Sequence, residues 1–313
     1  MPGICAIADQ GEEGFGGSLR ARLRRLQGPL VGGLGVALSL AALAVIVAEL
    51  HEQGMAPLLM LGQAGPAFWI VFVAGLMVEP FTEYSILRRL IGAGRDVFPP
   101  LVRKQALNNL LIGYAGDTYF AAWLQQHIGN ARKAFATVCD LAIISALVNN
   151  IATVILLILV WQPVQKLAGA RLDGWTMAVA GALIAVPVVL AAWRRVRTPD
   201  GGMGTILAFQ TGRTLLCTAL VGLTWHLALP EVPLLSWMLL MAARMVVSRL
   251  PIVPNKDLAF AGIVSLFMGP DSRIAPMVAA VALLTLVAHG VAMLLLSLAA
   301  RPRLSGLLHR AAG

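Results

Sequence analysis

The apolar stretch from Ile274 to Ala300 decides the class of fold. It reads IAPMVAAVALLTLVAHGVAMLLLSLAA and contains no Asp, Glu, Lys or Arg. About 20 such residues in a helix cross the roughly 30 Å of hydrocarbon in a bilayer. Only a helix or a closed barrel satisfies every backbone hydrogen bond there, and uninterrupted apolar runs exclude the barrel. The sequence therefore predicts an all-α, polytopic transmembrane bundle.

The overall composition points to the same class. Of the 313 residues, 58% are hydrophobic and 12% are charged, whereas a soluble domain carries about a quarter charged residues. The net charge is +9, but hydrophobic segments separate the basic clusters. That spacing is typical of membrane topology and argues against nucleic acid as a partner. The cysteines Cys5, Cys139 and Cys217 lie too far apart to predict a disulfide framework or a metal site.

Six further apolar runs are predicted to span the membrane together with Ile274 to Ala300. They are Leu30 to Leu50, Gly65 to Leu87, Thr137 to Trp161, Trp175 to Trp193, Phe209 to Leu229 and Pro233 to Leu250. We therefore expect about seven or eight spans in a transmembrane domain over residues 30–300. A basic segment, 1–29, precedes this domain and a basic tail, 301–313, follows it. The first run is interpreted as a retained anchor, because acidic and basic residues precede it.

The basic residues between the spans predict their orientation. Arginines precede Leu30, and basic residues that include Lys104 follow Leu87, whereas the loop from His51 to Ala64 contains no Lys or Arg. Because Lys and Arg near short loops stay in the cytoplasm, the N-terminus is expected to be cytoplasmic. The C-terminal arginines predict a cytoplasmic tail as well. The expected location is a bacterial inner membrane.

Two apolar segments are too short or too interrupted for ordinary spans. Seven spans that start inside would end outside, which conflicts with the cytoplasmic tail. We therefore expect Asp257 to Gly269 to join Pro251 to Asn255 as a broken crossing. The segment from Pro99 to Gln126 is interrupted by Gly113 and Gly116 and is predicted to form a re-entrant hairpin.

The two irregular segments, 99–126 and 251–269, align with each other at a single offset in residue number. It pairs Leu110 with Leu250, Ile112 with Ile252, Asp117 with Asp257, Phe120 with Phe260 and Ala121 with Ala261. Since Leu and Ala are abundant in this chain, a chance alignment is the competing explanation. In both copies, however, a helix breaker precedes a carboxylate and an aromatic residue. Broken helices at corresponding positions of two halves, here about 30–161 and 175–300, are typical of transporters built from inverted repeats.

Ionisable residues within the predicted membrane domain are candidates for a site. Each costs about 2.5–3.5 kcal/mol at the bilayer centre, so each needs a partner or a wet cavity. The predicted substrate-binding residues are Arg213, Arg244, Arg249, Asp117 and Asp257. Arg244 is the best candidate for a lipid phosphate, which a guanidinium binds bidentately. Coupling or structural charges are expected at Glu79, Asp140 and Lys256.

Each of these residues also has a plainer interpretation. Glu79 fits a structural ion pair with an arginine of a neighbouring helix, and Glu83 fits an interfacial position near Arg88. Asp117 and Asp257 fit helix N-caps better than substrate contacts. The arginines fit side chains that extend to the interface.

No nucleotide-binding loop, serine nucleophile elbow or metal-ligand spacing is found in the chain. The sequence therefore predicts neither an enzyme nor a cofactor nor a metal site.

Two stretches carry a family resemblance. They are Asn108 to Asn150, NNLLIGYAGDTYFAAWLQQHIGNARKAFATVCDLAIISALVNN, and Arg249 to Gly269, RLPIVPNKDLAFAGIVSLFMG. Through Gly116-Asp117, Ala136-Thr137-Val138 with Asp140, and Pro251 to Asp257, the chain resembles the flippase-like transmembrane family typified by the membrane half of lysylphosphatidylglycerol synthases. It departs from that pattern where Asp117 replaces Glu and where Pro254-Asn255-Lys256 replaces a glycine-rich break. The resemblance implies two related halves that move a lipid or lipid-linked molecule between leaflets without ATP.

The first functional hypothesis is therefore a translocator of an anionic lipid or lipid-linked glycan, with membrane lipids as partners. A second is a non-transporting subunit or scaffold of an envelope lipid or polysaccharide pathway, with a membrane protein partner or a second copy of the chain. A third is a proton-coupled solute transporter.

Overall fold

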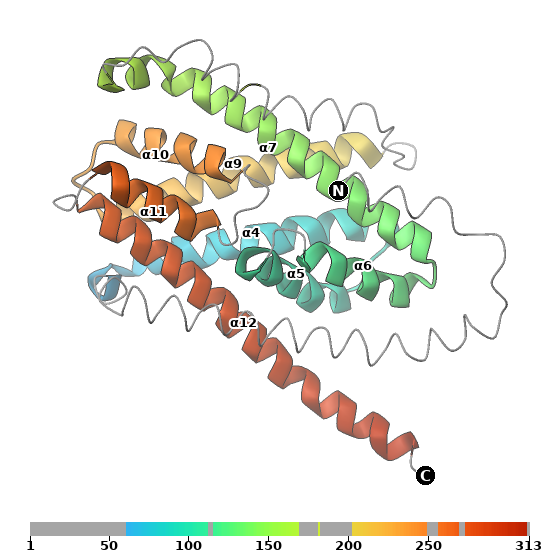
Figure 1. Cartoon of the computed structure of the whole chain (residues 1–313). Coiled ribbons are helices and arrows are strands. Elements are labelled where there is room, and N and C mark those ends of the chain that lie inside the picture. The colour runs from blue at the N-terminus through green and yellow to red at the C-terminus, as the bar shows by residue number, and fades with distance from the viewer. Residues whose placement is uncertain are drawn as a thin grey trace.

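The computed structural model describes residues 61–111, 115–168, 181, 202–248, 256–268 and 273–311. Within these ranges all regular secondary structure is helical (Figure 1). The predicted spans Leu30 to Leu50 and Trp175 to Trp193 lie outside the described residues, as do Arg249 and the predicted break from Pro251 to Asn255.

Four helices are long and apolar enough to cross a membrane. They are α4 (Pro66–Ile91), α7 (Ala131–Ala168), α9 (Gly202–Ala228) and α12 (Ile274–Ala311). These helices fall on four of the predicted spans, so the prediction of an all-α bundle is confirmed, and the four helices have the length and composition of membrane spans. The larger predicted number of spans exceeds the four that the described residues contain.

Between the long helices the chain forms four shorter ones, two between α4 and α7 and two between α9 and α12. They are α5 (Phe98–Leu110), α6 (Ala115–Ile128), α10 (Leu234–Val247) and α11 (Lys256–Met268). Each has 13 or 14 residues, which corresponds to about 20 Å of helix and falls short of a bilayer. The full span predicted at Pro233 to Leu250 is therefore not observed. The helix described in this segment is Leu234–Val247, and the Ser248 N–H donates to the Arg244 carbonyl at its end.

Local sequence explains where the first long helices begin and end. Pro66 occupies the first turn of α4, where a missing N–H costs nothing, and Gly92 ends the helix in the left-handed conformation with φ of 65°. The Gly92 N–H donates to the Arg88 carbonyl at 3.1 Å. Before α7, the Asn130 side-chain oxygen accepts a hydrogen bond from the Lys133 N–H at 3.0 Å and caps the helix.

The helices repeat in order and in length. The first half, α4 to α7, has helices of 26, 13, 14 and 38 residues. The second half, α9 to α12, has helices of 27, 14, 13 and 38 residues. Both halves are therefore a long helix, two short helices and a long helix. The predicted alignment of 99–126 with 251–269 falls on the paired short helices.

The two halves run in opposite directions. Figure 1 shows α4 and α9 side by side and antiparallel, and α12 running opposite to α7. Contacts between α4 and α9 agree, because Gly75 lies near Leu220 whereas Arg89 lies over the Phe209 ring. The first short helix of each half packs on the last helix of the other, α5 on α12 and α10 on α7. This arrangement is an inverted repeat.

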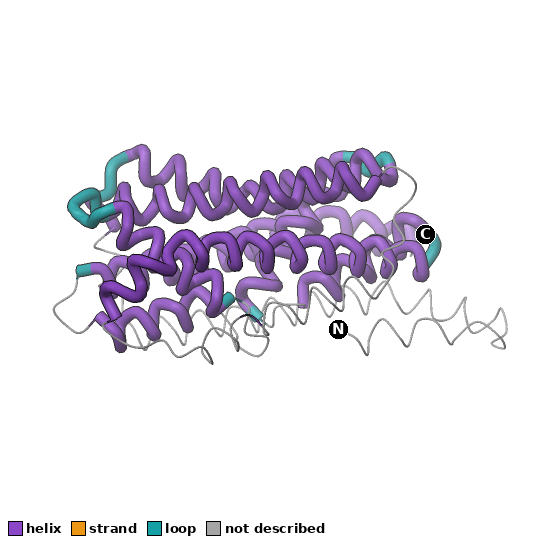
Figure 2. The backbone as a smooth tube through the Cα atoms, turned by 90° about the horizontal axis from the view of Figure 1, so that it is seen from above, coloured by secondary structure: helices purple, strands orange, loops and turns teal. Residues whose placement is uncertain are grey.

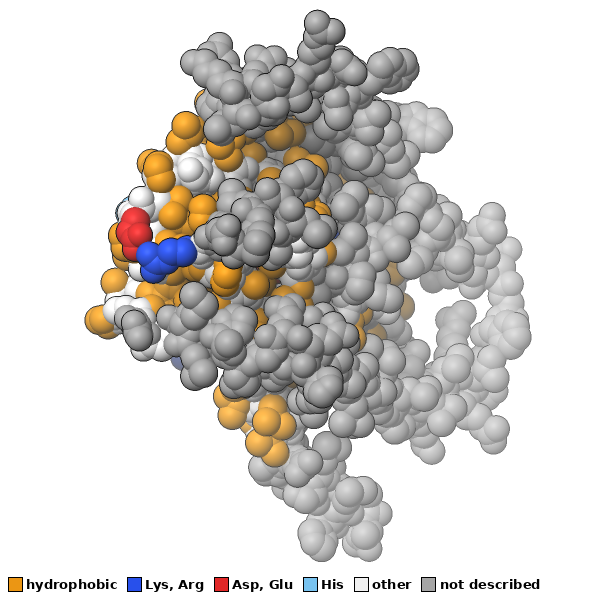
Figure 3. All heavy atoms as spheres, turned by 60° about the vertical axis from the view of Figure 1, so that its left-hand side comes forward, with side chains coloured by type: hydrophobic (Ala, Val, Ile, Leu, Met, Phe, Trp, Pro, Cys, Tyr) orange, Lys and Arg blue, Asp and Glu red, His pale blue; other side chains and the backbone are white. Residues whose placement is uncertain are grey.

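Polar and apolar side chains are distributed as a lipid environment requires. Large apolar residues face outward on all four long helices: Ile70, Ile158, Leu215 and Leu295 are between 60% and 70% exposed. Figure 2 shows the long helices lying alongside one another, with loops at the two ends of the bundle. At the end viewed in Figure 3, the described side chains are mainly apolar, with acidic and basic side chains in contact at one place. Large apolar side chains exposed along all four long helices are typical of surfaces that face lipid or another protein.

Candidate functional site

The first half contains a buried cluster of three charged groups. The Lys104 Nζ of α5 lies 2.6 Å from Glu83 Oε1 of α4 and 3.0 Å from Asp117 Oδ1 of α6. All three residues are between 5% and 7% exposed. The Asn108 amide donates to Asp117 Oδ2 at 3.1 Å. One ammonium thus neutralises one of two buried carboxylates, and the cluster carries a net negative charge when all three groups are ionised.

This cluster depends on a close approach of α5 and α6. The two helices form an antiparallel hairpin, in which Lys104 faces Asp117 while Asn108 faces Gly116. A Cβ at Gly116 would collide with the Lys104 carbonyl oxygen, so only glycine fits there. The Gly116 N–H donates to the Asn108 side chain at 2.8 Å, which satisfies a backbone group near the start of α6.

The second half contains a related ion pair. The Arg244 Nη2 of α10 lies 2.8 Å from Asp257 Oδ1 of α11, and Arg244 Nε donates to the same oxygen at 2.9 Å. Both side chains are 28% exposed. The Lys256 Nζ donates to the Ser248 carbonyl at 2.6 Å and thereby joins the start of α11 to the end of α10.

The two ion pairs occupy equivalent positions in the repeat. In the register that pairs Asp117 with Asp257, Lys104 corresponds to Arg244. The same register pairs Ser145 of α7 with Thr285 of α12, and it also pairs Asn149 with His289. A cation on the first short helix and an aspartate in the first turn of the second are therefore common to both halves.

A third ion pair joins the two long central helices. Arg213 Nη1 of α9 lies 3.4 Å from Glu79 Oε1 of α4, and Arg213 Nη2 donates to the Ser145 hydroxyl of α7. Glu79 thus forms an ion pair with an arginine of a neighbouring helix, as its plainer interpretation expected. Glu83, in contrast, is not interfacial as predicted, because Lys104 holds it in the interior.

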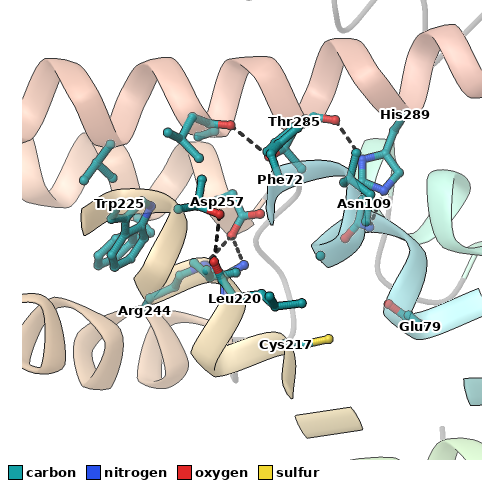
Figure 4. A pocket seen from close by; sticks show the side chains of 18 of the residues that line it. Phe72, Glu79, Asn109, Cys217, Leu220, Trp225, Arg244, Asp257, Thr285 and His289 are labelled. Atoms are coloured by element: carbon teal, nitrogen blue, oxygen red, sulfur yellow. Dashed lines mark hydrogen bonds and ion pairs between the residues drawn. The ribbon is translucent and has the colours of Figure 1, made fainter. Parts of the chain in front are cut away.

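A cavity of about 210 Å³ lies where the halves meet. It is lined by α4 and α5 of the first half and by all four helices of the second half. Its polar lining residues are Glu79, Gln105, Asn109, Thr224, Arg244, Asp257, Thr285 and His289. Figure 4 shows Arg244 paired with Asp257 and His289 close to Asn109. The cavity therefore contains several hydrogen-bonding groups and two carboxylates, each with an arginine partner.

The apolar part of the lining includes aromatic rings among aliphatic side chains. Trp225 of α9 stacks on Phe260 of α11 with ring centroids 5.9 Å apart, and Phe72 of α4 also faces the cavity. Opposite these rings, His289 contacts the Asn109 amide at 3.2 Å and the Thr285 carbonyl at 2.8 Å. A lining of apolar and aromatic side chains with a few polar groups is typical of sites that bind small molecules.

The structure brings most of the predicted site residues together, but in two groups. Arg244, Asp257 and Glu79 line the cavity. Asp117 belongs to the buried cluster, and Arg213 forms the ion pair with Glu79 without lining the cavity. Asp140 is half-buried on α7 and takes part in none of these ion pairs, and Lys256 has a structural role at the hairpin. Within the described part of the chain, no group of three His, Cys, Asp or Glu side chains could hold a metal ion.

Sequence reasoning missed several residues of this region. Lys104 was interpreted as one more basic residue of a cytoplasmic loop, yet it is the centre of the buried cluster. Gln105 and Asn109 of the cavity had no assigned role. Extending the alignment of the two irregular segments backward along the chain pairs Lys104 with Arg244, and this is the signal that finds it.

Comparison with protein-family models, with curated proteins and with solved structures finds no match to this chain. The assignment of function therefore depends on the architecture and on the chemistry of the cavity.

Proposed function

We propose that this integral membrane protein is a translocator that moves a lipid or lipid-linked molecule with an anionic headgroup between the leaflets of a membrane. The observation that carries the proposal is the cavity between two inverted halves, with the Arg244–Asp257 pair in its wall. Transporters built from inverted repeats place their substrate sites at the interface of the repeats, next to discontinuous helices.

The short helices support this proposal. Each pair, α5 with α6 and α10 with α11, would enter the membrane and return to the same side as a re-entrant hairpin. Irregular backbone is tolerated at that depth where protein or a water-filled cavity covers it. In this proposal, a hairpin of α10 and α11 would take the place of the broken crossing expected from sequence. With the predicted spans at residues 30–50 and 175–193, the chain would cross six times and return its C-terminus to the cytoplasm.

The lining of the cavity supports an amphiphilic substrate. A headgroup would contact Arg244, Asn109 and Thr285, while Trp225, Phe260 and Phe72 would contact its apolar portion. The arginine is already oriented by Asp257, so little side-chain freedom is lost on binding. The two halves would then alternate in opening toward each leaflet, as is usual for inverted repeats.

A flux measurement tests the proposal. The full chain is reconstituted into vesicles that contain fluorescent phosphatidylglycerol, and dithionite is added outside. Translocation is shown by reduction of label from both leaflets instead of the outer leaflet alone. Arg244→Ala is expected to slow this reduction, because the headgroup loses its cation. Arg273→Ala is the matched control, since Arg273 forms an ion pair with Glu231 in which both side chains are 69% exposed.

The competing functions give different results in the same system. A scaffold would show no flux and would copurify with a stoichiometric partner. A proton-coupled transporter would take up a soluble substrate when a pH gradient is applied and leave the labelled lipid in place. An Arg244→Ala protein that is correctly inserted and moves lipid at the unmodified rate contradicts the role of Arg244.

A further inference from the structure

The two halves differ at one position beside their equivalent ion pairs. The first helices of the halves, α4 and α9, can be aligned at their last residues, Ile91 and Ala228. This alignment also pairs Phe72 with Phe209 and Gly75 with Gly212. In the same register Glu83 of α4 corresponds to Leu220 of α9. The carboxylate that completes the first cluster is thus replaced by an apolar side chain in the second.

The surroundings of the two cations reflect this difference. Lys104 contacts both Asp117 and Glu83 and is 5% exposed. Arg244 contacts Asp257, and both it and Leu220 line the cavity. Figure 4 shows Leu220 next to the Arg244–Asp257 pair. The second half therefore has an apolar side chain and a cavity beside its cation, where the first half has a carboxylate of its own.

We infer that the cavity beside Arg244 binds an oxyanion, a phosphate or carboxylate group of a ligand, in the position that Glu83 occupies beside Lys104. Glu83 supplies the second carboxylate of the first half, whereas Leu220 supplies none in the second half, so the oxyanion of a ligand in the cavity would take that role. The inference deepens the proposed function and rests on it for the lipid origin of the oxyanion.

The chemistry of the cation favours this assignment. Arg244 donates to Asp257 through Nε and Nη2, and a guanidinium has further N–H donors on Nη1, whereas a lysine has three in total. The local charge is also acceptable, because the first cluster already holds one cation with two carboxylates in a more buried setting. Glu79 does not compete for Arg244, since it is paired with Arg213.

Substitution of Leu220 tests the inference directly. Leu220→Glu introduces a carboxylate where Glu83 lies in the first half, so the new side chain would bind Arg244 and exclude the ligand. Leu220→Gln has the same size without the charge and is the matched control. Leu220→Asp carries the charge on a smaller side chain and is used if the Glu variant is not recovered folded.

Binding is measured by calorimetry on the full chain in a neutral maltoside detergent. The probes are dihexanoyl phosphatidylglycerol, dihexanoylglycerol without phosphate, and glycerol 3-phosphate without acyl chains. We expect the phospholipid to bind and dihexanoylglycerol to bind at least tenfold more weakly. Leu220→Glu should raise the Kd of the phospholipid roughly tenfold or more, whereas Leu220→Gln should change it by less than about threefold.

The remaining outcomes show whether the oxyanion belongs to a lipid or to a soluble molecule, and which of the two proposals is refuted. Binding of glycerol 3-phosphate as tight as that of the phospholipid would assign the site to a soluble oxyanion. The site is refuted if neither phosphate probe binds, or if the Glu, Asp and Gln variants bind equally well. Binding without lipid flux refutes translocation and leaves the oxyanion site, whereas flux that Leu220→Glu leaves unchanged refutes the site and leaves translocation.

Discussion

Lys104 and Arg244 are equivalent residues of two inverted halves, and each forms an ion pair with an aspartate that lies 13 residues later in the chain. The first pair is completed by Glu83 and is buried, whereas the second lies in the wall of a cavity. The same helix hairpin therefore encloses its ion pair in one half and presents it to a cavity in the other. This difference between the halves is the basis of the proposed translocation of an anionic lipid and of the proposed oxyanion site beside Arg244.

Removal of the buried ammonium should destabilise the bundle. Lys104→Met leaves Glu83 and Asp117 without a cation in the interior, and breaking such a buried pair costs about 3–5 kcal/mol. We expect a lower Tm in thermal unfolding of the detergent-solubilised chain. Lys104→Arg should lose less, since it keeps the charge. Adding Glu83→Gln to Lys104→Met should recover part of the loss, and an unchanged Tm in the single variant would contradict the buried cluster.

Because α5 and α6 approach closely at Gly116, a methyl group added at this residue is expected to destabilise the bundle. Gly116→Ala would force the Lys104 backbone away and should cost about 1–3 kcal/mol, as overpacking does. Gly262→Ala in α11 is the control, because nothing lies within 4 Å of the added Cβ there. That control should be neutral or stabilising by up to about 1 kcal/mol through helix propensity. Equal stability of both variants in thermal unfolding would exclude the tight hairpin.

The inverted repeat predicts the sides of the membrane on which two exposed residues lie. Asp96 follows α4 and Glu231 follows α9, and their side chains are 62% and 69% exposed. Because α4 and α9 are antiparallel, the two residues should lie on opposite sides. Single cysteines at these positions, in a chain whose native cysteines are replaced by alanine, are treated with an impermeant maleimide.

In intact cells the cysteine at 231 should react and the cysteine at 96 should react after permeabilisation, since basic residues near Asp96 predict the cytoplasmic side. Labelling of both positions from one side would rule out the inverted arrangement of α4 and α9.

The Glu79–Arg213 pair predicts an energetic coupling between the central helices. Arg213 is 8% exposed and donates to Ser145 as well as to Glu79, so Arg213→Gln should destabilise by about 1–3 kcal/mol. A double-mutant cycle with Glu79→Gln should give a coupling energy of about 0.5–3 kcal/mol, as found for residues in contact. The cycle is measured by thermal unfolding. Additive effects of the two substitutions would show that the pair contributes nothing.

The long helices could be predicted from the sequence because hydrophobic length is a local property. Ile274 to Ala300 needs no partner to identify it as a span, and α12 begins at Ile274. The prediction of a span at Pro233 to Leu250 rests on the same local property, and this segment is not among the four spans that the described residues contain. Its apolar residues have the length of a span, but the helix ends at Val247 and packs as part of a hairpin.

The site was predictable in part. The two aspartates were found because they recur at matching positions of the two irregular segments, and Arg244 because a charge in an apolar segment is conspicuous. Lys104 was not found, since a lysine before an apolar segment has the same appearance whether it lies in a cytoplasmic loop or in the interior. Its contacts with Glu83 and Asp117 join residues of three helices, and such contacts depend on packing.

The sequence by itself determined that this chain is a helical membrane protein with two related irregular segments, because apolar length and helix breakers act within a few turns of one helix. Tertiary structure decided that the halves are antiparallel, that Glu83 is buried beside Lys104, and that Arg244 faces a cavity. Those outcomes follow from which helix packs against which, and a carboxylate or a leucine at one position of a neighbouring helix decides whether a cation is enclosed or accessible.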